Sequence, residues 1–290
     1  MSSVPGSSGS ALGDEPQIEI LANADAVVAA AAERIATALA GAVEQRGRAD
    51  WATTGGSTPI GIYRELAQSP RRDKVPWADV HVWWGDDRFV PRDHPLSNVL
   101  PLDQVLLRAT AFAGLSGEGE SGVDIEVGNQ AGALIPAANI HAMSMTAAIA
   151  RGEGPAWVAA AYEQELRAAR LPEAGGVPAF DVILSGIGAD GHILSVFPSS
   201  QVFDGSGKPW VAGIPAPEHI EPHVARVSLN PAFLAAAHLV LVVAFGAGKA
   251  DVLADLLGET RDLSRWPSQH ARRPNAVWLL DEAAAAKLPR

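Results

Sequence analysis

The sequence contains no cysteine among its 290 residues. This absence excludes disulfide bonds, thiolate metal sites and a cysteine nucleophile, and it is consistent with a cytoplasmic protein. Basic residues are also scarce, because 22 lysines and arginines stand against 33 aspartates and glutamates, for a net charge of -11. A chain this acidic is not expected to bind nucleic acid non-specifically, although a local basic cluster could still bind a small anion.

Long apolar runs are missing as well. We find no apolar stretch of about 18 residues, and we therefore predict no membrane-spanning helix and no membrane partner. Residues 1–16 are rich in glycine and serine and lack a signal-peptide pattern, so we expect a disordered N-terminal tail there. Residues 17–290 contain no repeat and no clear linker, and they are expected to form a single domain with a mobile, glycine-rich insertion near 113–136.

What is present is an alternation of apolar runs and helical patterns. DWATT, VHVWWG, FDVILS and LVLVVAF are apolar almost throughout. Helical patterns precede, separate and follow them: a long helix over 24–47 that ends near Gly47, another over 154–170, and a closing helix over EAAAAKL (282–288). Strands that are apolar without alternation are typical of a sheet covered on both faces. The sequence therefore predicts an α/β fold, with a doubly wound, mainly parallel, Rossmann-like sheet and helices on both faces.

Polar segments follow these strands, and ligands bind at the carboxyl ends of strands in such folds. The first segment forms either a phosphate cradle at a helix start or a plain capped turn; its residues are Gly55, Gly56, Ser57 and Thr58. In the second, Asp86-Asp87-Arg88, the arginine could bind a phosphate or merely neutralise an aspartate.

Two further basic residues are candidates for the same anion. Lys249, in GAGK, could supply a point charge or be an ordinary surface lysine. It does not complete a Walker A loop, because Val243 stands where the first glycine is required. Arg226, on the predicted strand VARVSL, could face inward to the same phosphate or form a structural ion pair.

The segment SGIGADGHILSVFP (185–198) contains Gly186, Gly188 and Gly191 in the G-x-G-x-x-G pattern. A dinucleotide site needs a long helix after the third glycine and an acidic residue about 20 positions on. Pro198 leaves room for only a short helix, which disfavours that interpretation. The alternative is that His192 is a general base whose ring is oriented by Asp190 or Asp86, as in hydrolase triads. A third interpretation is that His192 only caps the turn.

Two familiar motifs are not matched. HIEPH (219–223) is not the H-E-x-x-H zinc motif, and Pro222 would break the helix that such a site needs. No serine has glycine both two residues before and two residues after it, so the serine-hydrolase elbow is absent.

Together, TTGGSTP, WWGDDRFVP with HPLSN, and FDVILSGIGADGHILSVFP resemble, in order and spacing, the motifs of the 6-phosphogluconolactonase family. That family is similar in fold to the glucosamine-6-phosphate isomerases/deaminases. RVSLN and FGAGKADVL extend the resemblance, which covers about 18–280. Arg88, where the isomerases carry Tyr, and VFP (196–198), where they carry Asn-Glu-Pro, are similar to the lactonases. The departures are Asp87 for the usual Glu, Ile193 for Thr and Ser199 for a common Gly.

The resemblance implies hydrolysis of 6-phospho-D-glucono-1,5-lactone, the second step of the oxidative pentose phosphate pathway, with no metal and no cofactor. It implies that His192 activates water and that Asp190 and Asp86 position or polarise His192. The other matching residues would form the phosphate and sugar pocket: Gly55, Gly56, Ser57, Thr58, Arg88, Ser97, Asn98, Gly188, Gly191, Arg226 and Lys249.

The resemblance further implies a functional link to glucose-6-phosphate dehydrogenase. Two alternatives remain, a glucosamine-6-phosphate isomerase/deaminase and a non-catalytic sugar-phosphate-binding protein on the same fold.

Overall fold

The computed structural model describes residues 15–107, 132–203 and 205–288. Of the predicted tail, residues 1–14 lie outside the described residues, and so does the part of the predicted insertion up to residue 131. Glu15, which was expected to belong to the tail, forms ion pairs with Arg261 at 2.6 Å and Arg272 at 3.0 Å.

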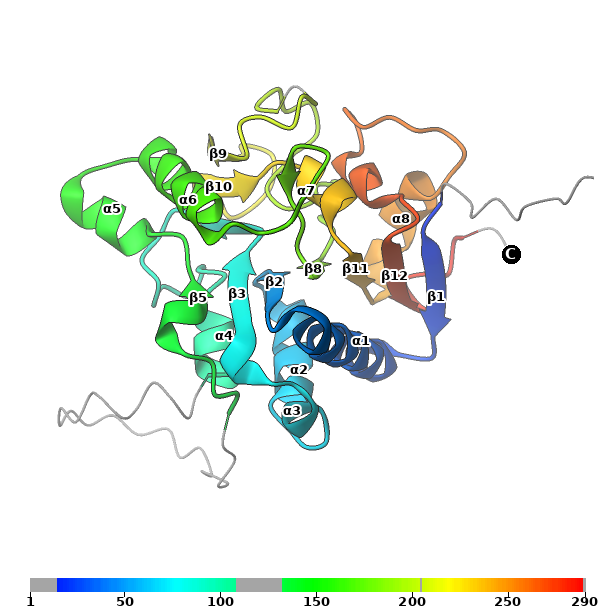
Figure 1. Ribbon diagram of the computed structural model, residues 1–290. Helices are drawn as coiled ribbons and strands as arrows, with labels where there is room; N and C mark the ends of the chain where they lie inside the picture. The colour runs from blue at the N-terminus through cyan, green and yellow to red at the C-terminus, as the bar shows by residue number, and fades with distance from the viewer. Residues whose placement is uncertain (1–14, 108–131, 204, 289–290) are drawn as a thin grey trace, which may run out of the picture.

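Strands and helices alternate along most of the chain (Figure 1). The strands are β1 (Gln17–Leu21), β2 (Ala49–Thr53), β3 (Val80–Trp84), β4 (Asp86–Arg88), β5 (Ile140–His141), β6 (Glu173–Ala174), β7 (Val177–Pro178), β8 (Val182–Ser185), β9 (Val211–Ile214), β10 (Arg226–Leu229), β11 (Leu239–Ala244) and β12 (Ala276–Asp281). The α-helices are α1 (Ala24–Arg46), α2 (Ser57–Leu66), α3 (Arg71–Lys74), α4 (Leu100–Val105), α5 (Met145–Arg151), α6 (Pro155–Ala169), α7 (Ala232–Ala236) and α8 (Ala250–Leu256). Short 3-10 helices are η1 (Trp77–Asp79), η3 (Ala137–Asn139), η4 (Ala247–Lys249) and η5 (Pro267–Ala271).

The main sheet has seven strands in the order β1-β12-β11-β8-β2-β3-β5, and every pair in it is parallel. From β2 the chain winds outward to β3 and β5, then returns to β8 and winds the other way to β11 and β12. Because the crossovers between parallel strands share one hand, this reversal puts their helices on opposite faces. Figure 1 shows α1 and α2 on one side of the strands and α6, α7 and α8 on the other. The predicted doubly wound fold is confirmed, with its switch point between β2 and β8.

A second, antiparallel sheet of three strands, in the order β4-β10-β9, was not predicted. Asp86-Asp87-Arg88 was expected only as a polar segment after a strand, but these residues form β4 and pair with β10. This small sheet therefore carries both Arg88 and Arg226.

Tryptophans of the core connect the sheet to the polar segments at its edge. Trp51, Trp83, Trp84 and Trp278 are all fully buried. The indole of Trp83 donates a hydrogen bond to Asp50 at 2.9 Å, and that of Trp84 donates to the carbonyl of Asn98 at 3.0 Å. The indole N–H of Trp51 is buried without a partner, whereas the bond from Trp84 attaches the loop at Asn98 to the core.

Helix α1 is long and apolar enough to span a membrane by length and composition alone. The prediction that no segment of the chain has this length and composition is therefore wrong. Its packing accounts for the composition. One face, including Val27, Ile35 and Leu39, is completely buried, and α1 contacts β2, β8, β11 and β12. A helix that covers a sheet needs this apolar face.

Two glycines of α1 provide a matched test of backbone conformation. Gly47 caps the helix at φ +72°, with its N–H bonded to the carbonyl of Val43, whereas Gly41 lies within the helix, where an added Cβ would meet only open space. We expect Gly47→Ala to lower the free energy of unfolding by about 1 kcal/mol, because L-residues avoid left-handed backbone. Gly41→Ala should raise it by about 0.5–1 kcal/mol. Urea unfolding of both variants measures these changes in the free energy of unfolding. Changes of the same sign in Gly47→Ala and Gly41→Ala would contradict the prediction.

Candidate active site

The polar segments that the sequence singled out meet at the switch point of the sheet. The first follows β2, the second follows β3, and the third, Gly186 to His192, follows β8. A Cβ on Gly55 would lie 2.2 Å from Oδ1 of Asn98 and 2.4 Å from its Cα. The glycine is thus required by the close approach of Asn98, and the first and second motifs are in direct contact.

The first motif begins helix α2. Gly56 is the N-cap residue at φ +91°, and Ser57 and Thr58 start the first turn. No side chain caps this end of the helix, so the first N–H groups of α2 have no side-chain acceptor there. A glycine at the N-cap cannot supply a side-chain acceptor, and the anion cradle at this helix start stays a prediction.

His192 and Asp190 form a hydrogen-bonded pair in the turn after β8. Nδ1 of His192 lies 2.6 Å from Oδ1 of Asp190, and the backbone N–H of His192 also donates to that oxygen at 3.2 Å. Both side chains are largely buried, with 18% and 15% of their surface exposed. Since the carboxylate holds Nδ1, the other ring nitrogen, Nε2, is left as the basic atom.

Asp190 is held in its ionised form. Burial works against ionisation, but the hydrogen bond and positive charge of His192, together with a hydrogen bond from His219, keep the pKa of Asp190 well below its usual range. An ionised carboxylate only accepts hydrogen bonds, so Nδ1 of His192 carries the proton that lies between the two groups.

Close packing fixes the turn that carries this pair. A Cβ on Gly188 would lie 2.0 Å from Nδ1 of His192 and 2.4 Å from Oδ1 of Asp190. Gly191 has φ +81°, and a Cβ there would lie 2.4 Å from the ring of Trp266. No helix follows Gly191, which agrees with the expectation that this segment is not a dinucleotide site. The glycines make room for the imidazole and the carboxylate.

The second motif forms a buried network beside the pair. Oδ2 of Asp86 accepts a hydrogen bond from Ser195 Oγ at 2.5 Å, and the side-chain amide of Asn98 contacts Oδ1 at 3.3 Å. Asp86 is only 4% exposed and makes no hydrogen bond to His192. Ser195 and Asn98 thus occupy its carboxylate, and the predicted role of Asp86 in positioning or polarising His192 stays a prediction.

Ser97 and Asn98 support Asp87 from the same loop. The backbone N–H of Asn98 donates to Oδ1 of Asp87 at 2.7 Å, and Ser97 Oγ donates to Oδ2 at 3.4 Å. Ser97 and Asn98 are each 2% exposed, and Oδ1 of Asn98 is buried without a partner.

Burial raises the pKa of Asp87 to about 7, the nearby charge of Asp86 adds to the rise, and N–H donation from Asn98 and Arg88 opposes it. A raised pKa in the folded state stabilises the protein fully at low pH, and this contribution is lost as the pH rises from about 4 to about 7. We expect Asp87→Asn to remove that loss, which amounts to at most about 4 kcal/mol. Urea unfolding at pH 5 and pH 7.5 measures it, with the exposed Asp93→Asn as control. If the free energy of unfolding changed equally between pH 5 and pH 7.5 in wild type and Asp87→Asn, the raised pKa of Asp87 would be contradicted.

Two arginines face each other across the small sheet. Arg226 and Arg88 are direct partners in the antiparallel register, so their side chains leave the same face. The Nε atoms of both are buried without a partner. Arg226 is 2% exposed and lies 5.0 Å from the ring centroid of Phe197. Like charges opposite each other are unfavourable, and an anion bound to the free donors would offset this.

Lys249 contacts the segment that precedes the His192–Asp190 pair. Its Nζ donates to the carbonyl of Ile187 at 2.9 Å, which places it against the turn after β8. Burial lowers the pKa of Lys249, and the charge of Asp190 opposes this effect. It is not the freely exposed lysine of the simpler interpretation.

Two groups that contact the pair were not predicted from the sequence. Nε2 of His219 lies 2.7 Å from Oδ2 of Asp190, so Asp190 bridges two histidines. The ring of Phe197 lies 4.8 Å from that of His192 and 5.8 Å from that of His219. The sequence HIEPH (219–223) contains His219, but this segment was considered only as a possible metal motif and not as a partner of Asp190. Among the described residues, no cluster of three or more potential ligands is placed to hold a metal.

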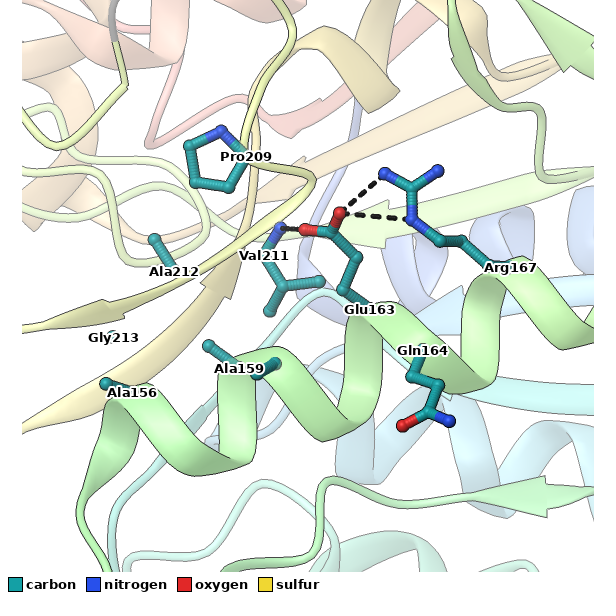
Figure 2. Close-up of a pocket in the computed structure, with 10 residues that line it drawn as sticks. Ala156, Ala159, Glu163, Gln164, Arg167, Pro209, Val211, Ala212 and Gly213 are labelled. Carbon is teal, nitrogen blue, oxygen red and sulfur yellow. Dashed lines mark hydrogen bonds and ion pairs between the residues drawn. The ribbon is translucent and has the colours of Figure 1, made fainter.

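An open groove of about 490 Å³ lies elsewhere, between α6 and β9 (Figure 2). Glu163 in this groove accepts hydrogen bonds from Arg167 at 2.6 Å and from the backbone N–H of Val211 at 3.3 Å. Its charged groups thus satisfy each other, and none of the predicted site residues lines it.

Comparison with known proteins places this architecture in a family. Residues 22–279 match the family model described as glucosamine-6-phosphate isomerases/6-phosphogluconolactonase. A Streptomyces coelicolor protein named 6-phosphogluconolactonase is 33% identical over 96% of this chain and 97% of its own length. One of the same name from Mycobacterium tuberculosis is 34% identical over 94% and 98%. The solved 6-phosphogluconolactonase of Trypanosoma brucei, 28% identical, superimposes with a TM-score of 0.75 and covers 96% of this chain and 100% of its own.

Proposed function

This chain belongs to the family of glucosamine-6-phosphate isomerases and 6-phosphogluconolactonases, and we propose that it hydrolyses 6-phospho-D-glucono-1,5-lactone to 6-phosphogluconate. The observation that carries the proposal is the pairing of a His192–Asp190 dyad with two arginines, the half-buried Arg88 and the buried Arg226, whose buried Nε atoms have no partner. A sugar phosphate lactone needs both features, a base for water and cations for the phosphate.

In the proposed reaction, the oxygen of a water molecule attacks the carbonyl carbon of the lactone while Nε2 of His192 takes a proton from that water. The carbonyl becomes a tetrahedral oxyanion, and its collapse breaks the bond to the ring oxygen. His192 then returns the proton to that oxygen, which becomes the 5-hydroxyl of the product. Asp190 stays ionised throughout and stabilises the imidazolium, in the manner of the aspartate of a serine-protease triad.

The phosphate is proposed to bind at Arg88 and Arg226, with the start of α2 and Lys249 beside it. Guanidinium groups suit this role because their planar fork matches phosphate oxygens. Anchoring a remote phosphate also orients the lactone, and positioning of this kind lowers the barrier without any change at the reacting atoms. These residues therefore contribute to the rate as well as to affinity.

The test is hydrolysis of freshly generated lactone by the purified chain, measured against an enzyme-free blank because lactones open spontaneously. We expect turnover well above the blank, and much weaker turnover of unphosphorylated glucono-1,5-lactone. No turnover above the blank would overturn the proposal. Deamination of glucosamine 6-phosphate would then indicate the isomerase activity, and binding of 6-phosphogluconate without turnover of either substrate would indicate a sensor.

The setting of the reaction is also proposed. A cytoplasmic location is consistent with the absence of cysteine, and a functional link to glucose-6-phosphate dehydrogenase, which would supply the lactone, follows from the proposed substrate.

A further inference from the structure

The loop between β9 and β10 brings His219 to the face of Asp190 that His192 does not use. His192 occupies Oδ1, and His219 occupies Oδ2 at 2.7 Å. His219 is half exposed, whereas Asp190 is 15% exposed, so the contact reaches a mostly buried carboxylate from the solvent side. The two carboxylate oxygens thus have one histidine each.

The loop is built to hold His219 in this place. Its neighbour Ile220 packs against the small apolar cluster of Phe197, Ala212 and Ile214. Within the loop, Nδ1 of His223 donates to the carbonyl of Pro217 at 2.7 Å. The ring of His219 also stands edge-on to Phe197, with 5.8 Å between centroids. These contacts restrain both the backbone and the ring.

We propose that His219 is a positioning residue for the lactonase reaction, which donates a hydrogen bond to Oδ2 of Asp190 and thereby fixes the carboxylate against His192; this inference rests on the proposed function. Without His219, Oδ2 of Asp190 loses this donor, and only the two bonds that His192 makes to Oδ1 restrain rotation of the carboxylate about its Cβ–Cγ bond. Rotation would misalign the hydrogen bond between Asp190 and Nδ1 of His192. His192 could then adopt the tautomer that carries its proton on Nε2, and a protonated Nε2 cannot accept a proton from water.

Three variants separate the donor from the ring. His219→Phe keeps an aromatic ring beside Phe197 but loses the donor, and His219→Gln keeps an N–H donor but loses the ring. Glu218→Ala, on the adjacent exposed residue, controls for changes in the loop. We expect His219→Phe to lower kcat about 10-fold with KM changed less than twofold, since the phosphate contacts are untouched. His219→Gln should recover most of this loss.

The tautomer of His192 provides a readout that needs no turnover. Long-range ¹H–¹⁵N correlation spectra report which ring nitrogen is protonated, and a His192→Asn variant assigns the signals. We expect the Nδ1-protonated form in the wild type and in His219→Gln, and a mixture in His219→Phe. An unchanged tautomer in His219→Phe would overturn the inference, as would failure of His219→Gln to restore it.

The two proposals fail in different ways. If the wild type hydrolyses no lactone but His219→Phe still changes the His192 tautomer, the positioning role stands and the proposed function does not. If lactone is hydrolysed and kcat, KM and tautomer are all unaffected by His219→Phe, the proposed function stands and His219 is only a loop residue.

Discussion

Replacement of His192 by Asn is expected to lower kcat for lactone hydrolysis by about 10² to 10⁴, the usual contribution of a general base. Asparagine places an N–H close to the position of Nδ1, so it retains a donor to Asp190 while removing the basic Nε2. The phosphate contacts of Arg88 and Arg226 are untouched, and KM should therefore stay within about twofold of wild type. Initial rates of acid release, corrected for spontaneous opening, measure both constants.

Asp190→Asn is the companion variant. An amide can offer its N–H group instead of an acceptor to Nδ1, which favours the wrong tautomer of His192, and it cannot stabilise the imidazolium. We expect a loss in kcat comparable to that of His192→Asn, with less than additive effects in the double variant because the two groups act as a unit. Wild-type kcat in His192→Asn would exclude His192 as the base, and fully additive losses would show that the two side chains act independently.

The parts of the fold that the sequence predicted correctly are those with strong local signals. Continuous apolar runs marked the buried parallel strands, and glycine marked the turns after them. Helix α1 was predicted to end near Gly47, where the structure has its left-handed cap. Ser199 has a left-handed backbone conformation, with φ +61°, although it is not a glycine. This conformation explains why a glycine is common at this position in the family that the sequence resembles.

The missed parts depend on contacts between distant residues. A closing helix was predicted over EAAAAKL (282–288), but these residues form turns. Oδ1 of Asp281 accepts the N–H of Ala284 at 2.7 Å, and Ala284 is fully buried, so tertiary packing overrides the helix propensity of alanine. VARVSL was predicted as a strand and contains β10, but the small sheet was missed because β4, with three residues, is too short for a reliable local pattern and pairs with a distant segment. His219 was missed because it lies 29 residues from Asp190, in an irregular loop.

Arg226→Met is expected to raise KM for the phosphorylated lactone about 10- to 100-fold while making the protein more stable. A charge-assisted hydrogen bond to phosphate is worth about 1.5–3 kcal/mol, which corresponds to this change in affinity. In the free protein, however, burial lowers the pKa of Arg226, and the positive charge of Arg88 lowers it further. The negative charges of Asp86 and Asp190 oppose this, but the pKa stays below its usual value, so the charged form is disfavoured there. Removing a buried cation that faces a like charge should raise the free energy of unfolding by about 1 kcal/mol.

Arg167→Met is the matched control for Arg226→Met. Arg167 also stacks on an aromatic ring, with its guanidinium 3.8 Å from the Trp210 centroid, but it pairs with Glu163 in the other groove. We expect it to leave KM unchanged. Hydrolysis of unphosphorylated glucono-1,5-lactone should be equally slow in wild type and Arg226→Met, because that substrate has no phosphate to lose. A rise in KM confined to the phosphorylated lactone and to Arg226→Met would locate the phosphate at this arginine pair. A loss of stability with unchanged KM would instead make Arg226 a structural residue and move the phosphate to the start of α2 and Lys249.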